Sequence, residues 1–338
     1  MKKINTTNTK SILHFSDVFG APKTHAEVQI ELMQKPEVWN VFKTFQPEIQ
    51  EQLFEFFEGK RSLRILYDVF MQKLFHPYYQ KERLESFLSS VINQNVQIRT
   101  VCPREGNRLA EEGSLTIMDI IVELENESLV NLEFQIYGYY FPGERGSCYL
   151  SDMIMRLYNK TKSQLGRNFS YRKMQPVYLI VMMDKSLSEF KDDKRHYIHH
   201  GKLKFDTDVS LKSLENIFYI SLDNYRIMSE NKNIESLQDA WLTFFSSDDP
   251  VQIMKLINQY PQFLSLYQEI AEFRKKPEDI IMDFSEALRI MDQNTVKYMI
   301  DDMQNQVSEL EKVIDEKDKA IDELRAALVS AQSAKDGV

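Results

Sequence analysis

The chain has 338 residues, of which 43% are apolar and 12% aromatic, enough for a packed core in one large domain or two smaller ones. This composition excludes a globally disordered chain, and no apolar run approaches the length of about 18 residues that indicates a membrane-spanning helix. Two cysteines are too few for a disulfide framework, and the first residues lack the apolar core of a signal peptide. We therefore expect a soluble protein of the reducing cytoplasm.

The net charge of −9 is unevenly distributed along the chain. Residues 145–204 carry 13 basic against 5 acidic side chains, a local excess of +8. Residues 105–133 carry 8 acidic side chains against 1 basic one, and residues 301–325 carry 9 against 4. An acidic segment followed by a basic one suits a metal site beside a phosphate-binding surface. The alternative is an ordinary solvated surface.

Helical periodicity dominates the first hundred residues. It predicts helices over residues 25–45, 47–60, 62–75 and 81–94, followed by a strand over residues 96–101. Pro47 stands in the first turn of the second helix and Gly59 at its end, as is common at helix termini.

The periodicity changes to two over residues 117–136, which predicts a β-hairpin. If the loop is the three residues 125–127, residues whose numbers sum to 252 face each other, and Asp119 lies opposite Glu133 with Gln135 on the same face. The Cβ atoms of such a pair are ~5 Å apart. Two carboxylates at that range repel unless a cation lies between them or one is protonated. A two-residue turn would break this pairing.

After the hairpin, the predicted elements are a helix and two strands, and the chain is then helical to its end. A helix is predicted over residues 143–166, and strands over residues 175–184 and 214–222. Together with the hairpin, this order indicates an α/β fold with a mixed sheet flanked by helices. Heptad spacing from Val296 to Leu328 predicts a coiled coil that self-associates, and a single amphipathic helix folding back on its own domain is the alternative.

The acidic pair of the hairpin has the chemistry of a divalent-metal site. Asp119 and Glu133 offer the oxygen ligands that Mg²⁺ or Mn²⁺ prefers, with Ca²⁺ as a further candidate. Gln135 is placed to orient a water molecule or contact a phosphate, but its amide carries no positive charge. By spacing alone this signal is weak, and a solvated hairpin face is the favoured explanation, because alternating strands with exposed acids are common.

Several pieces of the chain match a known family. They are, in chain order, "ILYDVFMQKLF", "LESFLSSVI", "PREGNRLAEEGSLTIMDIIVELENESLVNLEFQ", "FPGERGSCYLSDMIMRLYN", "MQPVYLIVMMDKS" and "FYISLDNYR". With Asp119 and the "EFQ" of residues 133–135 in a helix–strand–hairpin–helix–strand frame, the chain resembles the bacterial PD-(D/E)xK nuclease family transposases, also called recombination-promoting nucleases. The resemblance covers roughly residues 60–228.

This resemblance implies a restriction-endonuclease-like fold and metal-dependent DNA cleavage. It makes Asp119 and Glu133 metal ligands and puts Gln135 where the broad fold usually has a lysine. The glutamine form is frequent within the family, yet it removes the usual cation. Met118 stands where the name of the motif has proline. Asp68 lies on the helix before the first strand, where some relatives of the fold contribute a further acidic group; a capping or surface contact is the alternative.

Basic and aromatic residues follow the hairpin on the helix predicted over residues 143–166. Arg145 and Tyr149 are one helical turn apart, and Arg156 follows on the same helix, so we expect these three to contact nucleic acid. A helix-terminus contact or ion pair is the alternative for the first two. His196, His199 and His200 have no cysteine or spaced carboxylate that would complete a zinc site.

The sequence thus predicts a helical N-terminal segment (1–60), a nuclease-like core (61–230), a helical region (231–295) and a coiled coil (296–330). The expected function is a Mg²⁺- or Mn²⁺-dependent endodeoxyribonuclease of low sequence specificity, associated with transposition or recombination. The alternatives are a catalytically weak or inactive DNA-binding or scaffold protein on the same fold, and a coiled-coil adaptor. RNA stays open as a substrate, because phosphates look alike in both polymers.

Overall fold

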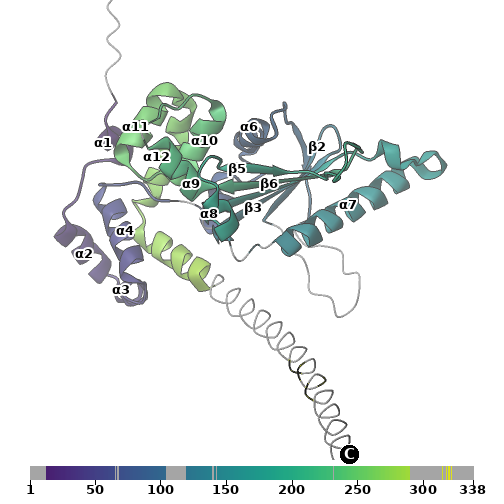
Figure 1. Ribbon diagram of the computed structural model, residues 1–338. Coiled ribbons are helices and arrows are strands. Elements are labelled where there is room, and N and C mark those ends of the chain that lie inside the picture. The colour runs from purple at the N-terminus through teal and green to yellow at the C-terminus, as the bar shows by residue number, and fades with distance from the viewer. Residues whose placement is uncertain are drawn as a thin grey trace, which may run out of the picture. The chain divides into compact units, whose positions relative to one another are not determined.

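The computed structural model describes residues 13–289, with gaps at 65, 67, 104–118, 139–140, 142 and 231, and four residues beyond them, 314, 317, 319 and 321. The chain divides into two compact units, Met1–Ala287 and Leu288–Val338. The first unit contains a sheet, the helices that cover it and a helical layer at one end (Figure 1). No described helix is long and apolar enough to cross a membrane.

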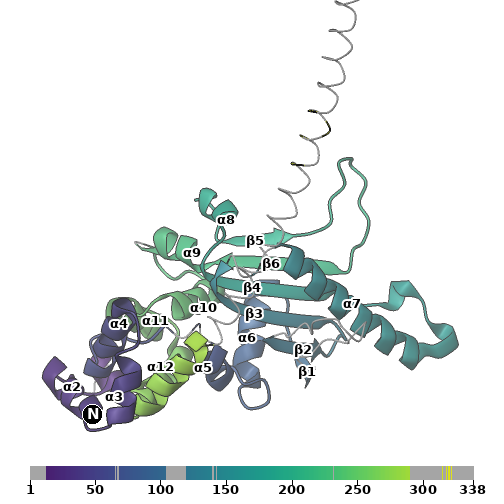
Figure 2. The same cartoon turned by 90° about the horizontal axis from the view of Figure 1, so that it is seen from below.

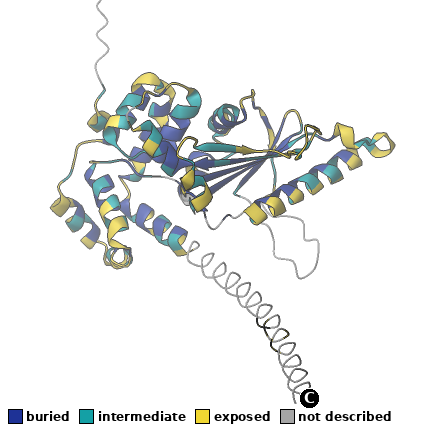
Figure 3. Cartoon of the chain, viewed as in Figure 1, coloured by how far each residue is buried: buried dark blue, intermediate teal, exposed yellow. Residues whose placement is uncertain are grey.

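A six-stranded mixed sheet forms the centre of the first unit, in the order β1-β2-β3-β4-β6-β5. The strands are β1 (Ile98–Val101), β2 (Ile120–Leu124), β3 (Leu129–Tyr137), β4 (Val177–Lys185), β5 (Ile198–Gly201) and β6 (Glu215–Ser221). Strands β3, β4 and β6 run parallel, and the outer strands pair antiparallel. The central strand β4 is apolar and buried on both faces, as expected for a covered parallel strand (Figure 3). The predicted restriction-endonuclease-like α/β fold agrees with this architecture.

The β2–β3 hairpin has the predicted register. Ile120 pairs with Leu132 and Ile121 with Asn131, so the paired numbers sum to 252 and the loop is residues 125–127. The N–H of Glu127 donates to the carbonyl of Leu124 at 2.9 Å, and Glu127 has a positive φ of 66°. A turn followed by a left-handed residue is the usual form of a three-residue hairpin loop. The loop length therefore decides which side chains face each other.

Helices cover both faces of the sheet. Helix α7 (Gly143–Leu165) crosses one face, where Met153 and Leu157 pack with Ile121, Leu179 and Val181 (Figure 2). Helices α6 (Lys81–Ile92) and α10 (Leu237–Ser246) lie on the other face. There the rings of Phe87 and Phe134 lie 5.0 and 6.3 Å from that of Phe245. Because the side chains of a strand alternate, odd-numbered residues of β3 and β4 face α7 and even-numbered residues face α10.

All but one of the remaining helices form the layer at one end of the sheet. They are α1 (Phe15–Phe19), α2 (His25–Met33), α3 (Pro36–Phe42), α4 (Pro47–Glu58), α5 (Asp68–Leu74), α9 (Leu222–Ser229), α11 (Pro250–Gln259) and α12 (Leu264–Phe273). Helix α8 (Ser188–Asp192) lies apart from this layer, where the ring of Phe190 contacts His199 of β5 and Tyr219 of β6. Buried Arg274 ties the two ends of the unit together, because its guanidinium donates to the carbonyls of Phe57 (2.7 Å), Phe19 (2.6 Å) and Ala21 (2.9 Å).

Two of the predicted helices differ from the structure, and one strand of the structure was not predicted. The helix predicted over residues 25–45 is two helices, since Pro36 lacks an N–H and begins α3 instead of continuing α2. The helix predicted over residues 62–75 forms only from Asp68, because the N–H of Ser62 bonds the carbonyl of Asp248 at 3.0 Å and holds that backbone in a tertiary contact. Strand β5 was not predicted.

The predicted coiled coil lies almost wholly outside the described residues. Of its heptad positions, Ile314, Lys317 and Ile321 are described, and they are helical. The coiled coil and the four-part division of the chain therefore stay predictions, beside the coarser division into two units.

Candidate active site

Backbone N–H groups hold the carboxylates of Asp119 and Glu133 across the β2–β3 hairpin. The N–H of Asp119 donates to Oε1 of Glu133 at 3.1 Å, and the N–H of Phe134 donates to Oδ2 of Asp119 at 2.9 Å. Glu133 is fully buried in the middle of β3, beside Val181 of β4, and Asp119 is half-buried immediately before β2. The hairpin thus brings two carboxylates together on the face that α7 covers.

Asn131 holds the same carboxylate from within the strand. Its Nδ2 donates to Oε1 of Glu133 at 2.8 Å, and the side chain is fully buried. Asn131 precedes Glu133 by two residues, so strand alternation puts both side chains on one face. Sequence reasoning did not single out Asn131, although this spacing was available as a signal.

Gln135 follows Glu133 by two residues on the same face. It pairs in register with Met183 of β4 and is half-buried. Within the described part of the chain its amide forms no hydrogen bond. An amide in this position adds a donor and an acceptor beside the carboxylates, but no charge.

Arg145 and Tyr149 approach the carboxylates from the first turns of α7. Arg145 donates to the Tyr149 hydroxyl from Nε (3.2 Å) and from a terminal nitrogen (2.8 Å), and its guanidinium lies 4.8 Å from the Phe141 ring centroid. Burial raises the pKa of Tyr149 to about 12, and the negative charge of Glu133 adds to this shift. Tyr149 therefore stays protonated at neutral pH.

The charge of Arg145 is coupled electrostatically to the same carboxylates. Burial alone would lower the pKa of Arg145, but Tyr149 and the negative charges of Glu133 and Asp119 raise it overall. A permanent cation thus lies within electrostatic range of both acids. This arrangement brings together four residues that the sequence pattern named separately.

A model of the PD-(D/E)XK nuclease family transposases matches residues 66–301. The chain belongs to this family. No curated protein and no solved structure matched the chain in the same comparisons. The matched range contains the whole sheet, α7 and the acidic pair of the hairpin. Nuclease families of this kind act on DNA and generally use divalent metal ions.

Two further residues singled out from the sequence are less closely tied to this family site. Asp68 is the first residue of α5, and its side chain lies outside the described part of the chain, so its catalytic role stays a prediction. Arg156 is held on α7, where it donates to Asp152 at 2.6 Å and to the carbonyl of Pro103 at 2.6 Å. With 14% of its side chain exposed, Arg156 has a clear local role, and its contact with nucleic acid stays a prediction.

Another buried acid of β2, Glu123, has different partners. It forms ion pairs with Lys160 of α7 and with Arg99 of β1, the latter at 3.4 Å. A buried carboxylate with two cationic partners is a structural element of the sheet–helix interface. Glu123 therefore does not extend the candidate family site, although it lies on the same face.

The histidines near β5 do not form a zinc site in the structure. His196 bonds Asp193 at 2.8 Å, and His200 stacks on Phe218 with 4.0 Å between ring centroids. Among the described residues, no group of three or more His, Cys, Asp or Glu side chains is arranged to hold a metal. Within the described residues, the candidate site therefore contains two carboxylates, those of Asp119 and Glu133.

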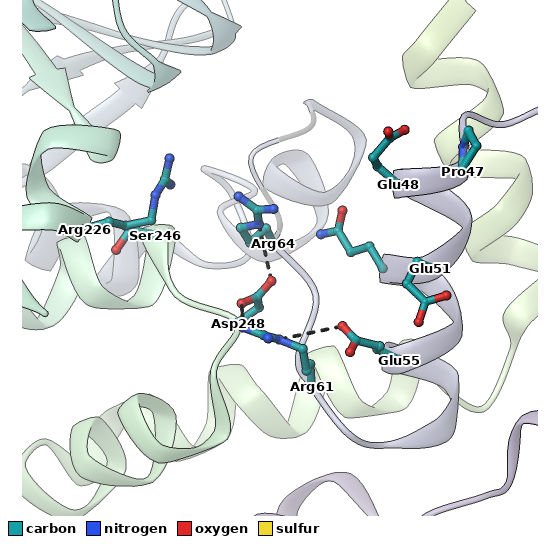
Figure 4. A pocket seen from close by; sticks show the side chains of 10 residues that line it. Pro47, Glu48, Glu51, Glu55, Arg61, Arg64, Arg226, Ser246 and Asp248 are labelled. Atoms are coloured by element: carbon teal, nitrogen blue, oxygen red, sulfur yellow. Dashed lines mark hydrogen bonds and ion pairs between the residues drawn. The ribbon is translucent and has the colours of Figure 1, made fainter.

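A pocket of about 720 Å³ lies elsewhere, between α4, residues 61–64 and the segment before α11 (Figure 4). Its arginines are engaged by acids: Arg61 contacts Asp248 at 2.8 Å and Arg226 contacts Asp184 at 2.6 Å. Four carboxylates, those of Glu48, Glu51, Glu55 and Asp248, line it with three arginines, so it presents no excess of positive charge for a phosphate. Neither carboxylate of the family site lines this pocket.

Proposed function

We propose that this protein is a metal-dependent DNA endonuclease that hydrolyses phosphodiester bonds, with Asp119 and Glu133 as the metal ligands. The observation that supports this proposal best is that backbone N–H groups hold both carboxylates across the hairpin, within electrostatic range of half-buried Arg145, in a chain of the nuclease family. Two charged acids that face each other across a hairpin repel unless a positive charge compensates them. A divalent cation supplies that charge.

The residues present fit Mg²⁺ or Mn²⁺. Both ions prefer carboxylate oxygens, and Mg²⁺ commonly takes one or two carboxylates and completes its shell with waters and substrate phosphate. Asn131 and the N–H of Asp119 orient the Glu133 carboxylate, as groups behind a metal ligand generally do. When bound, such an ion polarises a phosphate and lowers the pKa of a water molecule. Ca²⁺ has the same preference for oxygen and is the third ion to test.

Arg145 is proposed to supply the cation that Gln135 lacks. Its guanidinium keeps its charge, is held by the Tyr149 hydroxyl, and is coupled electrostatically to both carboxylates. A guanidinium forms strong, directed hydrogen bonds to phosphate oxygens. Arg145 would therefore bind the scissile phosphate, while the amide of Gln135 orients the attacking water.

Low sequence specificity and self-association complete the proposal. The basic residues between Arg145 and Lys204 would contact the phosphate backbone, which carries no sequence information.

Self-association through residues 296–330 would bring two sites to the two strands of a duplex. Light scattering of the full chain and of a chain ending at Asn294 tests this point: a smaller assembly for the shorter chain supports it, and equal assemblies contradict it.

The second candidate is a DNA-binding or scaffold protein without catalysis, and Gln135 in place of a lysine favours it. Incubating supercoiled plasmid with the full chain and Mg²⁺, Mn²⁺, Ca²⁺ or EDTA separates the two candidates. Metal-dependent nicking that is lost in folded Asp119→Ala and Glu133→Ala variants supports the endonuclease. Absence of nicking with every ion, with DNA bound equally by the three proteins, supports the scaffold.

A further inference from the structure

The end of α7 that lies away from the acidic pair is strongly basic. Between Asp152 and Asp184 the sequence contains no acidic residue and six basic ones. This end of the helix and the loop that follows project beyond the strands in both views of the fold (Figures 1 and 2). The loop contains two short 3-10 turns, Gly166–Asn168 and Tyr171–Lys173, and is largely exposed (Figure 3).

Two of the six cations form ion pairs with described acids, while Lys162 donates to the Tyr158 hydroxyl at 2.9 Å and Lys173 donates to the carbonyl of Asn168 at 3.0 Å. Arg156 pairs with Asp152, and Lys160 pairs with Glu123. The other four are exposed and form no ion pair with any residue that the structure describes; they are Lys162, Arg167, Arg172 and Lys173. In a chain with a net charge of −9, this concentration of positive charge without ion pairs favours the binding of an anionic partner.

Three aromatic rings lie among these cations. Tyr158 stacks on Tyr171 with 6.0 Å between centroids and 16° between planes. Phe169 contacts the same two rings edge-on, at 5.4 Å from Tyr158 and 5.2 Å from Tyr171. The side of Tyr171 away from this cluster faces solvent, since 70% of the residue is exposed. The other two rings therefore hold Tyr171 in place as a flat, exposed platform.

We propose that this basic aromatic tip, residues 158–173, binds a single strand of nucleic acid, with one base stacked on Tyr171 and phosphates bound by Arg167, Arg172 and Lys173. A positively charged surface with an exposed ring is the usual construction of a site for single strands, because every base offers a flat face to stack. The inference rests on the proposed function in taking nucleic acid as the substrate, but it uses no residue of the metal site.

The length of α7 sets the distance between the tip and the acidic pair. From Arg145 to Leu165 the helix rises about 30 Å, at 1.5 Å per residue. For duplex DNA between the two sites, with a rise of 3.4 Å per base pair, this corresponds to about nine nucleotides of each strand. A strand held at the acidic pair therefore reaches the tip only when it continues for roughly one turn of duplex. The tip should favour longer substrates for this reason.

A second copy of the chain is the competing occupant of the same rings. Two copies meeting at this surface would bring eight like charges together, four from each tip, with no acidic side chain between residues 152 and 184 to compensate them. A polyanionic strand is attracted by this positive charge, whereas the tip of a second copy is repelled by it.

Fluorescence anisotropy with labelled deoxyoligonucleotides in EDTA tests the proposal on the full chain. For a single strand of about 24 nucleotides, Tyr171→Ala should weaken binding about ten-fold, and Tyr171→Trp should restore it. Replacing Arg172 and Lys173 by alanine together should reduce the slope of log K against log salt by about 1.4. A strand of about 6 nucleotides should bind wild type more weakly than the long strand. Tyr79→Ala, which removes a ring that is 82% exposed in the turn before α6, should bind like wild type.

Equal binding of the long strand by wild type and Tyr171→Ala would overturn the proposal, as would equal losses in Tyr171→Ala and Tyr79→Ala. A changed assembly size in Tyr171→Ala with unchanged affinity would assign the surface to a second copy. Failure of the nuclease proposal would give a different result: the wild-type chain would not nick plasmid, while the tip variants would still bind the single strand more weakly than wild type. Conversely, if the tip variants nick plasmid normally and bind the strand as wild type does, the proposal of strand binding at the tip is contradicted and the nuclease proposal is not.

Discussion

Asp119 and Glu133 face each other across the β2–β3 hairpin, and the N–H of Asp119 donates a 3.1 Å hydrogen bond to Oε1 of Glu133. One acid is thus positioned partly by the backbone of the other. Any shift in the hairpin register moves both carboxylates, because side chains change face with each residue of slip. The loop at 125–127 therefore controls the geometry of the proposed metal site.

Metal binding is expected to stabilise the wild-type fold. At a free Mn²⁺ concentration of 100 times Kd, the free energy of unfolding should rise by about 2.7 kcal/mol. Asp119→Asn and Glu133→Gln should fold and lose most of this gain, because an amide is a weaker ligand than a carboxylate. Thermal melts with and without Mn²⁺ measure the effect. The control is Glu125→Gln, in the exposed hairpin loop, which should keep it.

Asn131→Ala should weaken metal affinity or cleavage about 10- to 100-fold, as loss of a group that orients a metal ligand typically does. Its Nδ2 donates to Oε1 of Glu133 at 2.8 Å, so removal frees that carboxylate to rotate. A Mn²⁺ titration and a plasmid assay measure the two quantities. Asn216→Ala, at a long 3.4 Å contact on β6, serves as control. Wild-type affinity and cleavage in Asn131→Ala would contradict the positioning role.

Tyr149→Phe should lower cleavage roughly 10- to 100-fold, since a hydrogen bond to a charged group contributes about 1.5–3 kcal/mol. The change leaves the ring packed and removes only the hydroxyl that accepts from Arg145. Arg145→Lys keeps the charge but loses the two-nitrogen contact, and it should be impaired as well. Single-turnover cleavage rates provide the measurement. Rates like wild type in both variants would place Arg145 outside the reaction.

Stability should fall at alkaline pH partly through Tyr149. Burial raises its folded pKa from 10.0 to about 12. The unfolded chain releases this proton first, so the contribution of Tyr149 is complete below pH 10 and is lost as the pH rises toward 12. Urea unfolding at pH 8, 10 and 11 should therefore show a smaller decline in Tyr149→Phe than in wild type. Parallel declines would show that Tyr149 titrates normally.

Arg274→Met should lower the free energy of unfolding by about 3 kcal/mol, because it leaves buried carbonyls of Phe19 and Phe57 without their charged donor. Lys275→Ala is the adjacent control, and it should change stability by less than about 0.5 kcal/mol, since Lys275 is exposed and pairs only with Glu272. Urea denaturation measures both. If Arg274→Met unfolded only helices α1–α4 and left the sheet folded, the first unit would not unfold as one cooperative structure.

Much of the candidate site was predictable from the sequence because it depends on local geometry. The loop at 125–127 and the alternation of side chains along a strand set the pairing of Asp119 with Glu133 before any tertiary contact is considered. The same holds for α7, whose apolar spacing is long and regular. Gln135 follows Glu133 by two residues on β3, so strand alternation puts both side chains on the same face.

Other features were decided by contacts between segments far apart in the chain. The N–H of Ser62 bonds the carbonyl of Asp248 and delays the start of α5, against the local helical pattern. Strand β5 has too little apolar alternation to be read from its four residues and forms because β6 offers it an edge. Similarly, Arg145 reaches the electrostatic range of Glu133 only because α7 packs on that face of the sheet.

What the sequence determined by itself was the hairpin, its register and the pairing of its two acids, because strand alternation and loop length act within about twenty residues. What the tertiary structure alone decided was which cations lie near that pair, which are held by other acids and which stay exposed. Arg145 lies within electrostatic range of the carboxylates, Arg156 is held by Asp152, and Arg172 stays exposed in the loop after α7. Charge interactions act through space, so the packing of α7 on the sheet assigns each of these arginines its role.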